Sequence, residues 1–273
     1  MMQGLLLSAA VLLGSGAIPA KGLGATIDVR HPEGTTHAYL ALLAVNGDSI
    51  AQGELLQTIK ADRVDSRLVF KFKDGSVHDE RTVFSQQGVF TLLHYRLTQR
   101  GPSFPDPLDV SMGRATGKYT VRTRSGKDGS EQILAGRLTF PTDVYNGMLI
   151  LLLKNLAPGE IKTVQIVAFT PKPKIVPIKL APVRKKTVKV GVVSKQATQY
   201  AMRPQLAGMT RFFGRLLGML PADDHYYCWI LNGEVSSFVQ FEGPLFLTGP
   251  IWRIELLNPQ LSLQVNGKIF SSN

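Results

Sequence analysis

Apolar and polar residues alternate with a period of two along most of this chain, the pattern of half-buried β-strands. In RLVFKFKDG, Leu68, Phe70 and Phe72 alternate with basic residues, and an Asp-Gly turn follows. KYTVRTR (118–124) alternates in the same way, and turn signals such as Thr116-Gly117 separate the runs. In VFTLLHYRLTQRG, the same spacing predicts a shared face for Val89, Leu93, Tyr95 and Leu97. The pattern predicts a mainly β protein: a large antiparallel curled sheet or half-barrel with one or two short packed helices.

Two segments have helical spacing instead. PTDVYNGMLILLLKNLAPGE predicts one buried helix that begins after Thr142 and ends at Pro158-Gly159. MTRFFGRLLGML, Met209 to Leu220, predicts a short amphipathic helix with arginines on its polar side. That helix fits either core packing over an open end of the sheet or a contact at a membrane surface.

Prolines 171, 173, 177 and 182 interrupt the segment TPKPKIVPIKLAPVRKK. Because proline cannot donate a ladder hydrogen bond, 170–186 is predicted to be an edge strand or a linker within one β-rich domain, 26–273.

Residues 1–25 resemble a secretory signal peptide. The first 20 residues are uncharged, and an apolar run from Leu5 to Ile18 precedes Pro19. This run predicts cleavage near Ala20 or Ala25, although no basic residue precedes it, and an uncleaved anchor or a misplaced start are the alternatives. The single cysteine excludes an intrachain disulfide, so an exported form relies on its core. We expect a periplasmic or cell-envelope protein.

The positive charge is concentrated in one part of the chain. Of the formal net charge of +11, the window 161–222 supplies twelve Lys or Arg and no Asp or Glu. We expect an anionic partner, such as a membrane surface, although lysines that protect a sheet edge give the same pattern. Nucleic acid is not expected, because no recognition motif and no regularly spaced aromatic residues accompany the charge. The predicted anionic-surface residues are Lys172, Lys174, Lys179, Arg184, Lys185, Lys186 and Lys189.

The stretch DDHYYCWILNGE raises the question of a cysteine–histidine site. In a strand, His225 and Cys228 point to opposite faces, so this pair cannot form a catalytic dyad, and Cys228 is predicted to be a small buried hydrophobe. Both faces of this strand are apolar, which fits either the centre of a sandwich or a wall between a core and an apolar cavity. For the cavity, the predicted binding residues for a lipid-like or other apolar ligand are Tyr227, Trp229, Phe238 and Trp252.

No sequence motif identifies a reaction. The chain contains no nucleophile elbow, P-loop or dinucleotide fingerprint, and its histidines lack metal-ligand spacing, so no cofactor is predicted. His78 to Glu80 is a dense titratable cluster on a predicted strand. A non-enzymatic binding protein is the first hypothesis, a hydrolase using dispersed acidic residues and histidines the second, and a structural or interaction module the third.

Several segments together resemble a known family. FKDGSVHDERTVFSQQGVFTLL, QRGPSFPDPLDVSM, NGMLILLLKN, TPKP and GPIWRIEL, spread over Thr36 to Leu257, are similar to uncharacterised exported bacterial proteins that share a domain of unknown function. The general form of that family resembles the curled sheet and helix of periplasmic lipoprotein carriers. The resemblance implies an exported β protein and identifies no catalytic residue.

Overall fold

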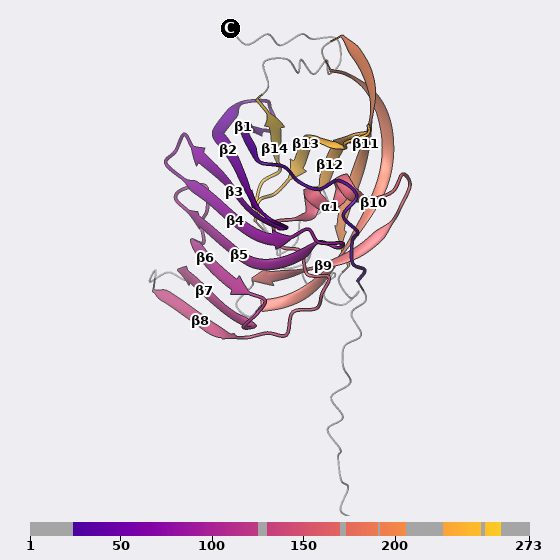
Figure 1. Cartoon of the computed structure of the whole chain (residues 1–273). Coiled ribbons are helices and arrows are strands. Elements are labelled where there is room, and N and C mark those ends of the chain that lie inside the picture. Colours follow the sequence, from indigo (N-terminus) through magenta and orange to yellow (C-terminus); the bar gives the residue numbers. More distant parts are fainter. Residues whose placement is uncertain are drawn as a thin grey trace, which may run out of the picture.

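The described strands of the protein form one antiparallel sheet that is curled and not closed (Figure 1). The computed structural model describes residues 24–124, 130–169, 173–190, 192–205, 226–246 and 249–257. Within them, the sheet has 14 strands in the order β8-β7-β6-β5-β4-β3-β2-β1-β14-β13-β12-β11-β10-β9. The predicted fold class is confirmed.

The sheet consists of two meanders joined through the first and last strands. The first meander contains β1 (Thr36–Ala44), β2 (Ser49–Lys60), β3 (Arg63–Phe72), β4 (Val77–Ser85), β5 (Thr91–Arg100), β6 (Leu108–Gly113), β7 (Lys118–Arg124) and β8 (Glu131–Arg137). After helix α1 (Leu149–Asn155), the second contains β9 (Lys162–Phe169), β10 (Pro173–Val190), β11 (Val193–Pro204), β12 (Tyr227–Leu231), β13 (Ser237–Gly243) and β14 (Trp252–Leu256). The β1–β14 pairing, in which Leu42 is opposite Ile254, makes the two meanders continuous.

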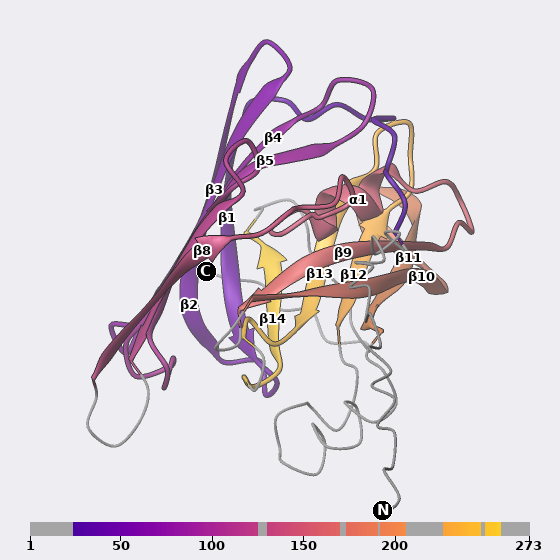
Figure 2. The ribbon, with the colours of Figure 1, turned by 90° about the horizontal axis from the view of Figure 1, so that it is seen from below.

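The core fills the concave side of the curl. Figure 2 shows α1 inside the curl, where it packs against β12 and β13. The concave face carries one large cluster of buried residues that includes Phe70, Leu42 and Tyr145. We call the opposite side of the sheet the outer face. This burial explains the period-two pattern, because alternate residues of each strand point into the curl.

Helix α1 is shorter than predicted. It begins at Leu149, whereas Thr142 was the expected start. The intervening residues bond instead to β9: Tyr145 N donates to Gln165 O (2.9 Å) and Gln165 N donates to Asp143 O (2.8 Å). The Asn146 side chain also exchanges two 2.8 Å bonds with the backbone of Val167. Since these extended pairings satisfy the backbone groups, the first half of the expected helix is not helical.

Strand β10 corrects the prediction for the proline-rich segment. Residues 173–186 belong to a continuous strand, which is second from the edge and no linker. The prolines are tolerated because β9 pairs with 173–180 and β11 pairs from Ile178 onward, so few positions are paired on both sides. Pro177 O accepts a bond from Gln205 N (2.7 Å), which places the pyrrolidine nitrogen on the side away from β9. Pro182 lies at an irregularity in the β10–β11 register.

One predicted face is interrupted by a bulge. His94 is opposite Val83, whereas Leu92 is opposite Phe84, so Leu93 has no partner in the ladder. Leu92 therefore joins the core in place of Leu93, which was expected to share the face of Tyr95 and Leu97.

The segment before β1 crosses the concave side and connects the two meanders. Ala25 N donates to Thr163 O on β9 (2.8 Å), and Phe90 N donates to Ile27 O (3.0 Å). The Asn155 side chain of α1 accepts bonds from the backbone nitrogens of residues 30 and 31. In the part of the chain that the structure describes, no helix is long and apolar enough to span a bilayer.

Candidate anion-binding site

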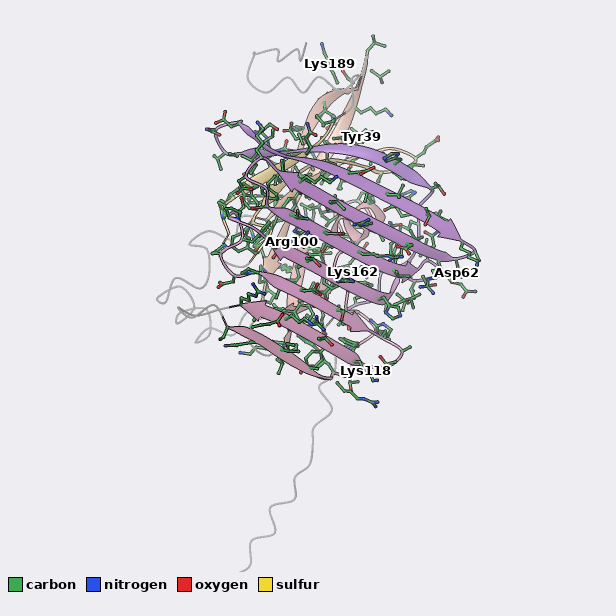
Figure 3. All side chains as sticks on the ribbon, turned by 90° about the vertical axis from the view of Figure 1, so that its left-hand side faces the viewer. Tyr39, Asp62, Arg100, Lys118, Lys162 and Lys189 are labelled. Atoms are coloured by element: carbon green, nitrogen blue, oxygen red, sulfur yellow. The ribbon has the colours of Figure 1, made fainter. Side chains whose placement is uncertain are left out.

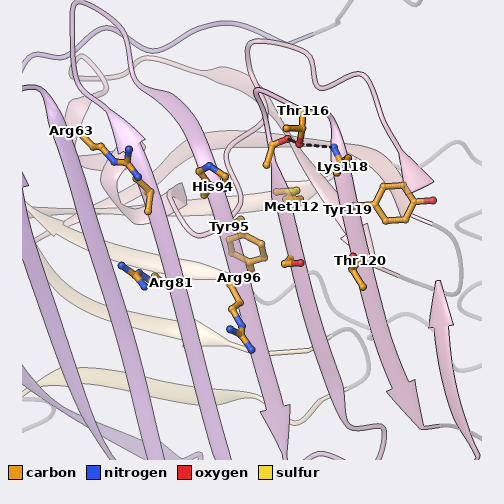
Figure 4. A pocket seen from close by; sticks show the side chains of 13 residues that line it. Arg63, Arg81, His94, Tyr95, Arg96, Met112, Thr116, Lys118, Tyr119 and Thr120 are labelled. Atoms are coloured by element: carbon orange, nitrogen blue, oxygen red, sulfur yellow. Dashed lines mark hydrogen bonds between the residues drawn. The ribbon is translucent and has the colours of Figure 1, made fainter. Parts of the chain in front are cut away.

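A hollow of about 460 Å³ lies on β3 to β7 and is open to solvent (Figure 4). We call it the basic trough. Its lining includes four cationic side chains and no Asp or Glu: Arg63, Arg81, Arg96 and Lys118. His94, Ser111 and two threonines add polar groups, and Val83 adds an apolar one. Met112 and Tyr119 also border the hollow, but their side chains belong to the core side of the sheet.

The sheet register aligns the trough cations. Arg81 of β4 lies opposite Arg67 of β3 on one side and Arg96 of β5 on the other. Like charges that are directly opposite repel, and each of these arginines is paired diagonally with an aspartate. Arg67 bonds to Asp79 (2.6 Å), Arg81 bonds to Asp65, and Arg96 bonds to Asp109 (3.1 Å). The ion pairs fix the guanidinium groups along the outer face.

The trough keeps an excess of positive charge after this pairing. The hydrogen bonds from Arg81 and Arg67 lower the pKa of Asp65 and the pKa of Asp79, so both carboxylates stay ionised at neutral pH. Arg63 and Lys118 form no salt bridge with a described residue, although the charge of Arg63 also helps to lower the pKa of Asp65. These two cations lie on β3 and β7, with three strands between them, so each is available to an anionic group bound at its own end of the trough.

The four residues predicted to bind a ligand do not come together. Trp252 and Phe238 belong to the core on the concave face, whereas Trp229 lies in a separate cluster on the outer face. Tyr227 shares the side of Trp229, because Cys228 between them faces the core. Rings of Phe72, Phe104 and Phe246 surround Trp252 at 5.4 to 6.1 Å between centroids. Trp252 is therefore a core residue.

Two cations of β10 cover Trp229. Lys186 Nζ lies 4.1 Å and Arg184 Cζ 5.5 Å from the ring centroid, within the range of cation–π contacts. Burial and the neighbouring Arg184 lower the pKa of Lys186. The sequence placed these residues in two different predicted sites, whereas in the structure they contact one another.

The remaining predicted basic residues are exposed on the β10–β11 hairpin, which extends past the rest of the sheet (Figure 1). Lys174, Lys179, Lys185 and Lys189 are exposed, and Lys172 lies outside the described residues. The hairpin tip carries a fully exposed Val192 and a half-exposed Val193. Figure 3 shows Lys189 and Lys118 at opposite ends of the molecule, so the hairpin and the trough are separate surfaces. The Met209–Leu220 segment, His225 and residues 1–23 of the predicted signal peptide also lie outside the described residues.

Packing and hydrogen bonds within the fold account for the buried titratable groups. Cys228 is fully buried, as predicted, and burial raises the pKa of its thiol. Glu80 accepts a bond from the Tyr95 hydroxyl (2.8 Å), but its burial has the larger effect and raises the pKa of its carboxyl. His78 lies in the core beside Phe70 and Phe104, although the cluster from His78 to Glu80 was expected on an exposed face. Asp79 is the member of that cluster that faces outward and pairs with Arg67.

Comparisons with known proteins gave no match to a protein-family model, a curated protein or a solved structure. A function therefore has to be argued from the geometry of the chain itself.

The local pattern of the sequence did not predict the trough. Its cations come from four strands, and each strand contributes one or two charges that an exposed strand face commonly carries. The available signal was the repetition of arginine on the outward positions of β3, β4 and β5.

Proposed function

We propose that the protein is an exported, non-enzymatic binding protein for an anionic, lipid-like molecule held in the basic trough. The observation that supports this proposal is that cations without an ion-pair partner among the described residues line one hollow together with Val83. The apolar ligand of the initial hypothesis remains, but its proposed site moves from the aromatic strands to β3–β7.

The trough suits an anionic headgroup attached to a chain. Arg81 and Arg96 are held by their aspartates, while Arg63 and Lys118 are free to pair with a phosphate or carboxylate. A guanidinium binds such oxygens in a bidentate way, and an ammonium supplies a compact charge. Val83, the apolar side chain on the trough face of β4, offers a contact for the hydrocarbon part of such a ligand.

The β10–β11 hairpin supports the second part of the proposal, which is contact with an anionic surface. Lys185 and Lys189 are exposed without an acidic partner in the described chain, and Lys195 lies across the hairpin from Val188. Polybasic segments bind anionic headgroups with about 1 kcal/mol per basic residue. The exposed Val192 and Val193 place apolar surface at the same tip.

Binding of dodecyl phosphate, followed by calorimetry below its micellar concentration, tests the trough. Since this removes the free cation at either end of the trough, Arg63→Gln combined with Lys118→Gln should weaken binding about tenfold or more. The control is Lys71→Gln combined with Lys73→Gln, which removes the same charge from exposed positions outside the trough lining. The control should bind like the unmodified protein.

Two further ligands separate the sources of affinity. Inorganic phosphate should bind more weakly than dodecyl phosphate, and dodecyl maltoside should show no dependence on Arg63 or Lys118. If both double variants bind equally weakly, the loss of net charge explains the effect and the trough does not. If dodecyl phosphate does not bind at all, the proposal is refuted.

A further inference from the structure

The two edge strands of the sheet, β9 and β8, differ in whether their free side is covered. At one end, β9 is covered along its free side: Ala25 N donates to Thr163 O, and residues 143–146 bond to Gln165 and Val167. At the other end, β8 pairs with β7 alone among the residues that the structure describes, and its seven residues are mostly exposed. Figure 1 shows β8 as the outermost strand of its meander. An uncovered edge presents unpaired backbone donors and acceptors to another strand.

The sequence of β8, EQILAGR, is complementary to itself in the antiparallel direction. In the register that overlaps all seven residues, Leu134 meets Leu134 of a second copy. Glu131 then lies opposite Arg137 of the second copy, and Arg137 opposite Glu131 of the second copy. Residues that are paired in a continuous sheet must point to the same face. This register meets that condition, because residues 131 and 137 are an even number of positions apart and share a face of β8.

The charges of β8 have no ion-pair partner within the described chain. Arg137 is directly opposite Lys118 of β7, an unfavourable pairing of like charges. Glu131 is opposite Arg124, but no ion pair links them. A second copy would supply Arg137 with a carboxylate and Glu131 with a guanidinium on the outer face.

The apolar residues of β8 fit the same arrangement. Ile133 is 59% exposed and would lie opposite Ala135 of the second copy, which leaves room for the larger side chain. On the concave face, Tyr119 lies over Gly136, where an added Cβ would be 2.7 Å from the tyrosine oxygen. This cross-strand contact covers the glycine of the edge strand and supports a regular strand.

We propose that β8 pairs antiparallel with β8 of a second copy of this chain, about a two-fold axis at Leu134, so that two 14-stranded sheets become one. The pairing is independent of ligand binding in the trough. It would place the two troughs on the same side of the joined sheet, because β7, which carries Lys118, is adjacent to β8.

Charge reversal with rescue tests the proposal. The molar mass of the purified full chain is measured by light scattering over a range of concentrations. The unmodified protein should be dimeric. Glu131→Arg places arginine opposite arginine at two positions, and Arg137→Glu places glutamate opposite glutamate, so each should weaken dimerisation at least tenfold. The double variant Glu131→Arg with Arg137→Glu restores opposite charges and should dimerise again.

Arg100→Glu is the control, because it makes the same charge change on an exposed residue of β5. It should leave the dimer intact, and circular dichroism should show native β structure in every variant. A monomeric unmodified protein, a dimer that tolerates both single reversals, or a double variant that stays monomeric would overturn the proposal.

Discussion

His78 should make the stability of the protein depend on pH. Its side chain is 4% exposed, and Gln99 Nε2 donates to its Nδ1 at 3.0 Å, which favours the neutral ring. Burial lowers the pKa of His78 from 6.5 to about 4, and the nearby Asp79 opposes this only in part. In the unfolded chain the ring takes up a proton first. Folding stability contributed by the neutral ring is therefore complete above pH 6.5 and is lost as the pH falls toward 4.

The size of this effect follows from the two pKa values. The full shift corresponds to about 3 kcal/mol of unfolding free energy, of which about 2 kcal/mol is lost between pH 7 and pH 5. Urea unfolding at both pH values measures it for the unmodified protein and for His78→Gln. The variant removes the titrating ring, so its loss over this interval should be about 2 kcal/mol smaller. Aspartates with lowered pKa, such as Asp65, titrate in both proteins and cancel in the comparison. Equal losses in the two proteins would show that His78 is not held neutral by burial.

Three other features give direct expectations. Arg114→Met should lower the unfolding free energy by about 3 kcal/mol in urea titrations, because the guanidinium donates to four backbone carbonyl groups at 2.6 to 3.4 Å; an unchanged midpoint would contradict this. Cys228 should react with a thiol reagent at pH 8 only after denaturation, since it is fully buried with a raised pKa, and rapid labelling of the native protein would refute that placement. Val192→Ser with Val193→Ser should reduce sedimentation with phosphatidylglycerol vesicles, whereas Val235→Ser, at another exposed valine, should not; equal binding by all three proteins would exclude the tip.

The local pattern of the sequence was sufficient for the strands and for their faces. Phe70 and Phe72 are buried as their alternation predicted, and Cys228 and Trp229 point to opposite sides. The failures arose where pairing across the sheet overrode local spacing. The bulge at Leu93 shifted one face, and the bonds of 143–146 to β9 removed the first half of a helix that the apolar spacing favoured.

The candidate site depends on information that no single strand contains. Trp229 and Trp252 were grouped because both are large aromatics in apolar strands. Alternation within one strand, however, does not show which residues of a neighbouring strand lie on the same face of the sheet. That relation depends on register, and the β12–β13 pairing contains an irregularity between Trp229 and Ile230. Arg63 and Lys118 line the two ends of one trough only because β3 to β7 lie in chain order within the sheet.

The β1–β14 pairing has a consequence for how the protein is made. Strands β2 to β8 can pair in the order in which they emerge, because each lies beside its neighbour in sequence. β1, by contrast, keeps one side open until the last strand has been synthesised, and it pairs there through Leu40 with Leu256. Local pairings form quickly and distant ones slowly, so joining the two meanders should be the late step of folding. Until then, the open side of β1 is a position at which a nascent chain can aggregate, and a chaperone that binds unpaired strands would act there.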